Sequence, residues 1–160
     1  MSEETRMTIL NLTQHNATQD QLQAGVVDLP VEIKERLVSL ITFDTIPSEI
    51  ELITNANSVA NLATAYFREL AETCDLSTAE KHALDLDKYA PGLNSYNNVT
   101  MASVMIGGAP FFMSHLESAL GRSKIRPMYA FSARESVDIE QEDGSISKTT
   151  VFKHLGFVKV

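Results

Sequence analysis

Residues 100–120 combine a strand-like segment, a glycine turn and a helix-like segment, and this succession constrains the fold more than any other feature. Residues 101–106 form a short apolar run of strand length. Gly-Gly-Ala-Pro follows at 107–110, and apolar side chains then recur at helical spacing up to Gly121. Proline is favoured in the first turn of a helix, because the N–H group it lacks would have no intrahelical partner there. The segment therefore predicts a buried strand that leads through a tight turn into a helix.

A strand, a glycine turn and a helix in this order aim backbone N–H groups at an anion beyond the end of a sheet. We therefore predict ligand contacts from the turn, namely from Gly107, Gly108, Ala109, Pro110 and Phe111. An ordinary strand-to-helix turn without a ligand explains the same residues equally well. The turn is not the phosphate loop of nucleoside triphosphatases, because no Lys-Ser or Lys-Thr follows the glycines.

Three capping boxes, in which a Ser or Thr is followed three residues later by Glu or Gln, predict where helices begin. They are Thr18 with Gln21, Ser48 with Glu51, and Ser77 with Glu80. Helical spacing follows each box, to about Gly25, Cys74 and Asp87, and also extends from Val31 to about Thr42.

Short β-rich segments lie between these helices, and their order predicts the fold class. The predicted strands are 8–13, 26–29, 101–106 and 126–132. Strands separated by helices predict an α/β fold with a mainly parallel sheet flanked by helices. Near the end of the chain, Asp143-Gly144 lies between two alternating segments and predicts a C-terminal β-hairpin.

Length and charge restrict the function. A chain of 160 residues, 44% hydrophobic and 21% charged, predicts one globular domain over residues 1–160. The net charge of −8 argues against binding a long nucleic acid, although a small phosphate ligand is compatible with it. We expect a cytoplasmic protein without a membrane segment, because no apolar run is long enough to span a bilayer and the single cysteine, Cys74, has no disulfide partner. The histidines lack metal-ligand spacing, so no metal or cofactor is predicted.

Ligands of parallel sheets bind beyond the carboxyl ends of the strands, and three segments are expected to converge there: 11–16, 107–112 and 132–136. His15 is a candidate general acid or base, although a plain surface role fits it as well. Arg134 offers a fork for phosphate, unless it pairs with a neighbouring carboxylate. Ser132 offers a hydroxyl donor. Further ligand contacts are predicted for Asn11, Thr13, Gln14, Glu135 and Ser136.

Three stretches together resemble the small CRISPR-associated proteins with a CARF-like, Rossmann-like fold. The first comprises Ile9–His15 and the segment that continues to Asp28-Leu29-Pro30. The second is the strand, glycine turn and helix of 104–116, and the third is the strand, Ser/Arg cluster and acidic hairpin of 130–158. The chain departs from the family pattern by carrying Ser-Ala-Arg-Glu at 132–135 instead of Ser-Glu-Arg, and residues 48–87 resemble a helical insertion.

The resemblance implies a homodimer that binds a cyclic oligoadenylate across its axis and cleaves it as a metal-independent ring nuclease. Cleavage would give 2′,3′-cyclic phosphate products and would switch off an antiviral, CRISPR-type response. In this interpretation the glycine turn holds the phosphate, Arg134 stabilises its charge, and His15 transfers the proton. A sensor or sponge that binds the nucleotide in the same pocket without cleaving it is the alternative.

Overall fold

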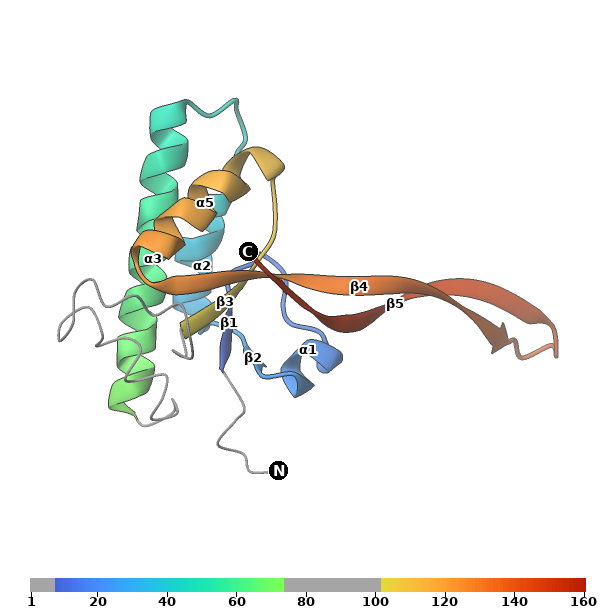
Figure 1. The fold of residues 1–160 in the computed structure, drawn as a ribbon. Coiled ribbons are helices and arrows are strands. Elements are labelled where there is room, and N and C mark those ends of the chain that lie inside the picture. Colours follow the sequence, from blue (N-terminus) through green and yellow to red (C-terminus); the bar gives the residue numbers. More distant parts are fainter. Residues whose placement is uncertain (1–7, 74–101) are drawn as a thin grey trace.

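The computed structural model describes residues 8–73 and 102–160 as an α/β body with a long hairpin that extends away from it (Figure 1). In chain order the elements are β1 (Ile9–Asn11), α1 (Gln19–Gln23), β2 (Val26–Val27), α2 (Val31–Ile41), α3 (Glu49–Glu72), β3 (Ala102–Ile106), α5 (Pro110–Arg122), β4 (Ile125–Glu140) and β5 (Ile146–Lys159). No helix in the described ranges is long and apolar enough to cross a membrane.

The strands form one sheet in the order β2-β1-β3-β4-β5. β1 pairs in parallel with β2 on one side and with β3 on the other, and β3 pairs in parallel with β4. β5 runs antiparallel to β4 and completes the hairpin. The prediction of a mainly parallel sheet flanked by helices, with a C-terminal hairpin, is confirmed at this level.

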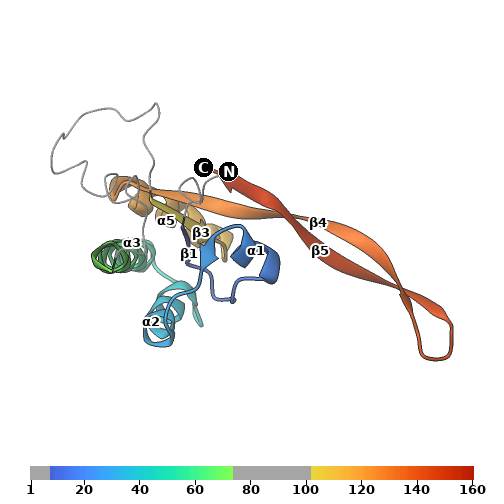
Figure 2. The ribbon, with the colours of Figure 1, turned by 90° about the horizontal axis from the view of Figure 1, so that it is seen from below.

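One face of the sheet carries the main core, and α2, α3 and α5 cover it (Figure 2). Adjacent strand residues point to opposite faces, so Leu10 of β1 joins this core while Ile9 joins a smaller cluster on the other face. α3 packs against α2 and α5 and buries seven side chains. The part of the expected insertion that α3 represents is therefore integral to the core, while residues 74–87 lie outside the described ranges.

The helix starts follow the sequence signals. Thr18 and Gln21 form the reciprocal capping box at α1, and the Ser48 side chain accepts a hydrogen bond from the Glu51 N–H at α3. Pro110 occupies the first turn of α5, as predicted. The third box, at Ser77, lies outside the described residues.

The hairpin is longer than the sequence predicts. The strand expected to end at Ser132 continues to Glu140, and β5 pairs with it over nearly its whole length. The polar residues after Phe131 remain in the strand because β5 satisfies their backbone groups. A tight turn closes the hairpin, in which the Gly144 N–H donates to the Gln141 carbonyl and Gly144 has φ of 84°. That conformation favours glycine.

Phe67 provides a test of the core. Its side chain is fully buried between α3 and the rest of the main core, so Phe67→Ala should lower the free energy of unfolding by about 3–5 kcal/mol. Phe152→Ala is the matched control because Phe152, on the hairpin, is 68% exposed; it should cost less than about 1 kcal/mol. Urea unfolding followed by circular dichroism measures both, and equal losses would contradict this assignment of the core.

Candidate functional site

A crevice lies where the chain changes direction along the sheet. After β1 the chain moves to one side to form β2, and it then returns across β1 to form β3. Such a reversal leaves an opening beyond the carboxyl ends of the two strands, where ligands of α/β proteins bind. The opening has a volume of about 760 Å³. It is lined by Thr13, Gln14, His15, Asn16, Thr18, Gln21, Ile41, Thr42, Phe43, Met105, Ile106, Gly107, Gly108, Ala109, Phe111, Met113, Tyr129 and Ala130.

The loop after β1 is shaped by the side chain of Asn11, which is completely buried beneath it. Its Nδ2 donates to the Asp28 carboxylate (2.7 Å) and to the His15 carbonyl (2.8 Å). Its Oδ1 accepts from the backbone N–H (2.9 Å) and the hydroxyl (2.7 Å) of Thr13. Both donors and the acceptor of the amide are therefore used within the protein. Asn11, predicted as a ligand contact, instead positions the loop.

Two charged residues, Asp28 and Lys34, form hydrogen bonds with the same loop. The Asp28 carboxylate accepts a hydrogen bond from the Ala17 N–H (3.0 Å) in addition to that from Asn11. The Lys34 ammonium donates to the His15 carbonyl (3.1 Å) and to Asn16 Oδ1 (3.3 Å). The His15 carbonyl is thus turned inward, while the residue as a whole is exposed and lines the crevice. Asp28 and Lys34 were not predicted as site residues, since each lies far from His15 along the chain.

The glycine turn forms the second side of the crevice. A Cβ atom on Gly107 would lie 3.6 Å from the Thr13 side chain, so the turn and the β1 loop are close neighbours. Gly108 has φ of 148°, which favours glycine. No side chain caps α5, because its N-cap residue is Ala109 and Pro110 follows. The N–H of Phe111 therefore has no intrahelical acceptor and is available at the positive end of the helix.

The third side of the crevice is aromatic. Phe111 is 51% exposed, and its ring meets that of Phe43 edge to face at a centroid distance of 5.6 Å. Phe112 is buried and belongs to the core. Burial, and secondarily the nearby Glu117 carboxylate, raise the pKa of Tyr129. Its phenol hydroxyl is a hydrogen-bond donor. The crevice therefore combines polar loops with a ring surface large enough for a planar group.

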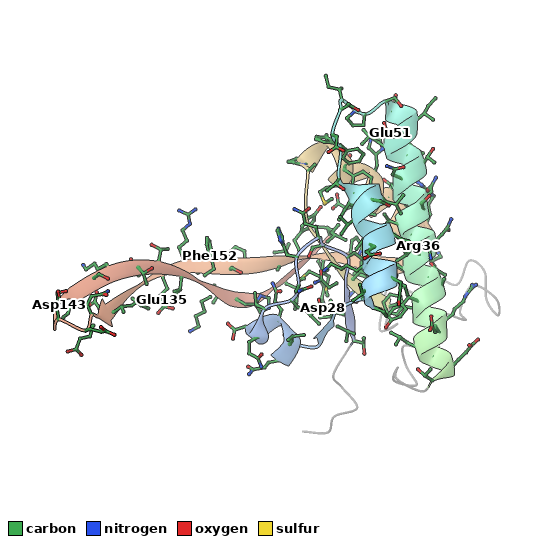
Figure 3. All side chains as sticks on the ribbon, turned by 180° about the vertical axis from the view of Figure 1, so that it is seen from behind. Asp28, Arg36, Glu51, Glu135, Asp143 and Phe152 are labelled. Carbon is green, nitrogen blue, oxygen red and sulfur yellow. The ribbon has the colours of Figure 1, made fainter. Side chains whose placement is uncertain are left out.

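The structure does not bring the predicted segment 132–136 to this crevice. β4 pairs with β3 as far as Tyr129, opposite Ile106, and Arg134 lies five residues farther along the strand, about 16 Å at 3.3 Å per residue. The guanidinium of Arg134 instead lies over the Phe152 ring, 5.5 Å from its centre. Figure 3 shows Glu135 and Phe152 on the hairpin, away from Asp28 in the body. Ser132 and Ser136 belong to the same hairpin segment, because β4 continues where the sequence predicted a strand end.

Metal binding has no obvious location in the part of the chain that the structure describes. Residues 8–73 and 102–160 contain no group of three His, Cys, Asp or Glu side chains arranged to hold a metal ion.

The family relationship covers both the crevice and the hairpin. A family model described as "Uncharacterized protein MJ1673 family" matches residues 7–158. The chain belongs to this family. No curated protein and no solved structure matches the chain. The description of the family names no activity.

Asp28 provides a test of how the site is built. Asp28→Ala should lower the free energy of unfolding by about 1–3 kcal/mol, because the Asn11 amide and the Ala17 N–H lose their acceptor. It should also broaden or shift the amide resonances of residues 13–17 in NMR spectra. Asp44→Ala is the control, since Asp44 is exposed; its effect should stay within about 0.5 kcal/mol. A loop unchanged by the loss of Asp28 would contradict the positioning role.

Proposed function

We propose that this chain has a Rossmann-like, CARF-like fold and binds a cyclic oligoadenylate in the crevice, which it cleaves as a metal-independent ring nuclease. The observation that carries the proposal is the meeting of His15, the open N-terminus of α5 and the exposed ring of Phe111 in one opening. The N-terminus of α5 suits a phosphodiester, the Phe111 ring suits a base, and His15 suits proton transfer.

Binding of the nucleotide follows from the three sides of the crevice. Backbone N–H groups at the start of α5 favour a phosphate by direct donation and by the helix dipole. Phe111 and Phe43 offer ring surface for an adenine, and base–aromatic stacking is worth about 1–3 kcal/mol per base. Thr13, Gln14 and Asn16 supply polar groups to the same opening. Lys34, behind the loop, adds positive charge close to the site.

The cleavage step requires no water. The 2′-hydroxyl of one ribose attacks the adjacent phosphorus in line, and the bond from phosphorus to the 5′ oxygen of the next nucleotide breaks. The products are a 2′,3′-cyclic phosphate and a free 5′-hydroxyl. His15 accepts the proton from the 2′-hydroxyl and, once protonated, returns it to the departing 5′ oxygen. The Phe111 N–H stabilises negative charge that develops on the non-bridging oxygens, and positioning of the attacking group contributes much of the rate.

A ring of several nucleotides requires two crevices. A volume of about 760 Å³ is in the range of pockets that hold a drug-sized ligand, and the ring is larger than that. A homodimer with a two-fold axis presents two equivalent crevices to a symmetric ring. Removal of the ring would switch off an antiviral, CRISPR-type response, and this cellular role rests on the sequence resemblance.

A binding protein without activity is the second candidate, and the position of the hairpin favours it. Ser132 and Arg134 were expected to take part in the chemistry, yet neither lines the crevice of its own chain. His15 is then the one histidine in the described lining. A sensor or sponge would use the same amides and rings without cleavage.

The decisive experiment incubates the purified protein with cyclic di-, tri-, tetra- and hexa-adenylate in EDTA and separates the products by chromatography. We expect linear products that end in a 2′,3′-cyclic phosphate. His15→Ala should lower the cleavage rate by about 10²–10⁴-fold while retaining binding. His115→Ala is the control, because His115 lies on α5 and is not in the crevice lining.

Each result separates the candidates. Intact ligand that co-elutes with the protein supports the sensor or sponge. Unchanged cleavage by His15→Ala removes this residue from the mechanism, and the absence of both binding and cleavage for every ring contradicts the proposal.

Phe111 tests recognition of the base. Phe111→Ala should weaken binding of the adenylate ring by about 5- to 150-fold, which corresponds to the loss of one stacking contact of about 1–3 kcal/mol. Phe152→Ala is the matched control, since Phe152 is also an exposed phenylalanine but lies on the hairpin. Isothermal titration calorimetry in EDTA measures both affinities. Equal affinities for Phe111→Ala and the wild type would show that this ring does not contact the ligand.

A further inference from the structure

A second hollow adjoins the crevice, and the two openings share Phe43 and Phe111. The second hollow has a volume of about 540 Å³. Its lining consists of these two rings, residues 44–47 of the connection between α2 and α3, and Leu52 of α3. Figure 1 shows this connection beside the start of α5. Because Phe43 and Phe111 also line the crevice, the two rings form the wall between the openings.

Packing in the core fixes this wall. Phe43 meets Phe111 edge to face at a centroid distance of 5.6 Å, and it meets Phe112 in the same way at 5.5 Å. Phe112 is buried, so Phe43 is held from the side of the core. Phe111 is 51% exposed and leaves ring surface free for a ligand. Aromatic side chains of this kind serve as platforms on which successive bases stack.

The second hollow is suited to an uncharged planar group. Its lining is mainly apolar, and Ile46 is 98% exposed, so a ligand that covers this side chain removes apolar surface from water. No lysine or arginine belongs to the lining, which includes the Asp44 carboxylate. A phosphate would be repelled there, whereas a carboxylate accepts a hydrogen bond from an exocyclic amino group such as that of adenine.

The start of α5 places a phosphate at the wall itself. The Phe111 N–H has no intrahelical acceptor, and the ring of the same residue lines both openings. A phosphodiester joins two nucleosides, one on each side of the phosphorus. When its phosphate lies at the Phe111 N–H, one nucleoside occupies the crevice and the other is directed toward the second hollow.

We infer that the second hollow is a subsite for the base of the neighbouring nucleoside, so that two bases lie on the two sides of the Phe43–Phe111 wall. The inference rests on the proposed function, because it takes a phosphodiester to lie at the start of α5. It defines the ligand of a single chain as a dinucleotide unit. The site then recognises the bases on both sides of the bond that is cleaved.

The test compares the affinities of two small probes by isothermal titration calorimetry in EDTA. One is 2′-O-methyladenosine 3′-(methyl phosphate), and the other is the linear dinucleotide ApA with a 2′-O-methyl group on its first ribose. Each probe carries one phosphodiester, and neither is cleaved because the attacking hydroxyl is blocked. We expect the dinucleotide to bind about 5- to 150-fold more tightly, since its second base adds one stacking contact.

Ile46→Glu should remove this gain and leave the affinity for the methyl diester within about threefold of the wild type. Ile46 lines the second hollow and not the crevice. Ile50→Glu is the matched control, because Ile50 is 78% exposed and lines neither opening; it should keep the gain. Thermal unfolding of each variant checks that the body remains folded.

NMR gives a readout that needs no variant. The δ1 methyl resonance of Ile46 should shift when the dinucleotide is added and not when the methyl diester is added, while that of Ile50 stays in place. If the methyl diester binds and the dinucleotide shows no gain, or the gain survives Ile46→Glu, the subsite is overturned and the crevice proposal stands. Absence of binding for both probes at millimolar concentration overturns the crevice proposal together with the subsite.

Discussion

The buried amide of Asn11 is the interaction on which the rest of the site depends. An amide inside a protein is costly unless every polar atom has a partner, and this one obtains all its partners from the β1 loop and from Asp28. The Thr13 N–H and the His15 carbonyl of the loop point inward, because they bond to the Asn11 amide. His15 itself lines the crevice. The shape of this side of the crevice thus follows from the hydrogen bonds that satisfy the buried Asn11 side chain at the end of β1.

Topology explains why this loop meets the glycine turn and not another part of the chain. β1 lies between β2 and β3, so its carboxyl end is adjacent to that of β3. A Cβ atom on Gly107 would make an ordinary van der Waals contact of 3.6 Å with the Thr13 methyl group, so the two loops are direct neighbours. Residues almost a hundred positions apart therefore share one opening, and neither loop alone provides both the glycine turn and the His15 imidazole.

Local sequence patterns predicted the helix starts and the order of helices and strands in the body. They did not predict contacts between residues that are distant in the sequence. Capping at Thr18 and Ser48, Pro110 in the first turn of α5 and the alternation of strands with helices all express local backbone preferences. The end of β4 was misplaced because Ser132 to Ser136 have the composition of a loop, while pairing with β5 keeps them extended. Asp28 and Lys34 were missed as parts of the site because their partners are 11 to 19 residues away. A local sequence pattern does not indicate a hydrogen bond between residues so far apart in the chain.

Because Arg134 does not line the crevice, it adds no positive charge there. The described lining of the crevice contains neither lysine nor arginine, and the chain as a whole carries −8. A phosphate bound there depends on backbone N–H groups and the α5 dipole, with the ammonium of Lys34 one layer behind the loop. Such donors are fixed in direction and lose no side-chain entropy on binding, in contrast to a flexible arginine. Backbone donors of this kind are better suited to orienting a single phosphodiester than to binding many phosphates. The acidic character of the chain and a small phosphate ligand are therefore compatible.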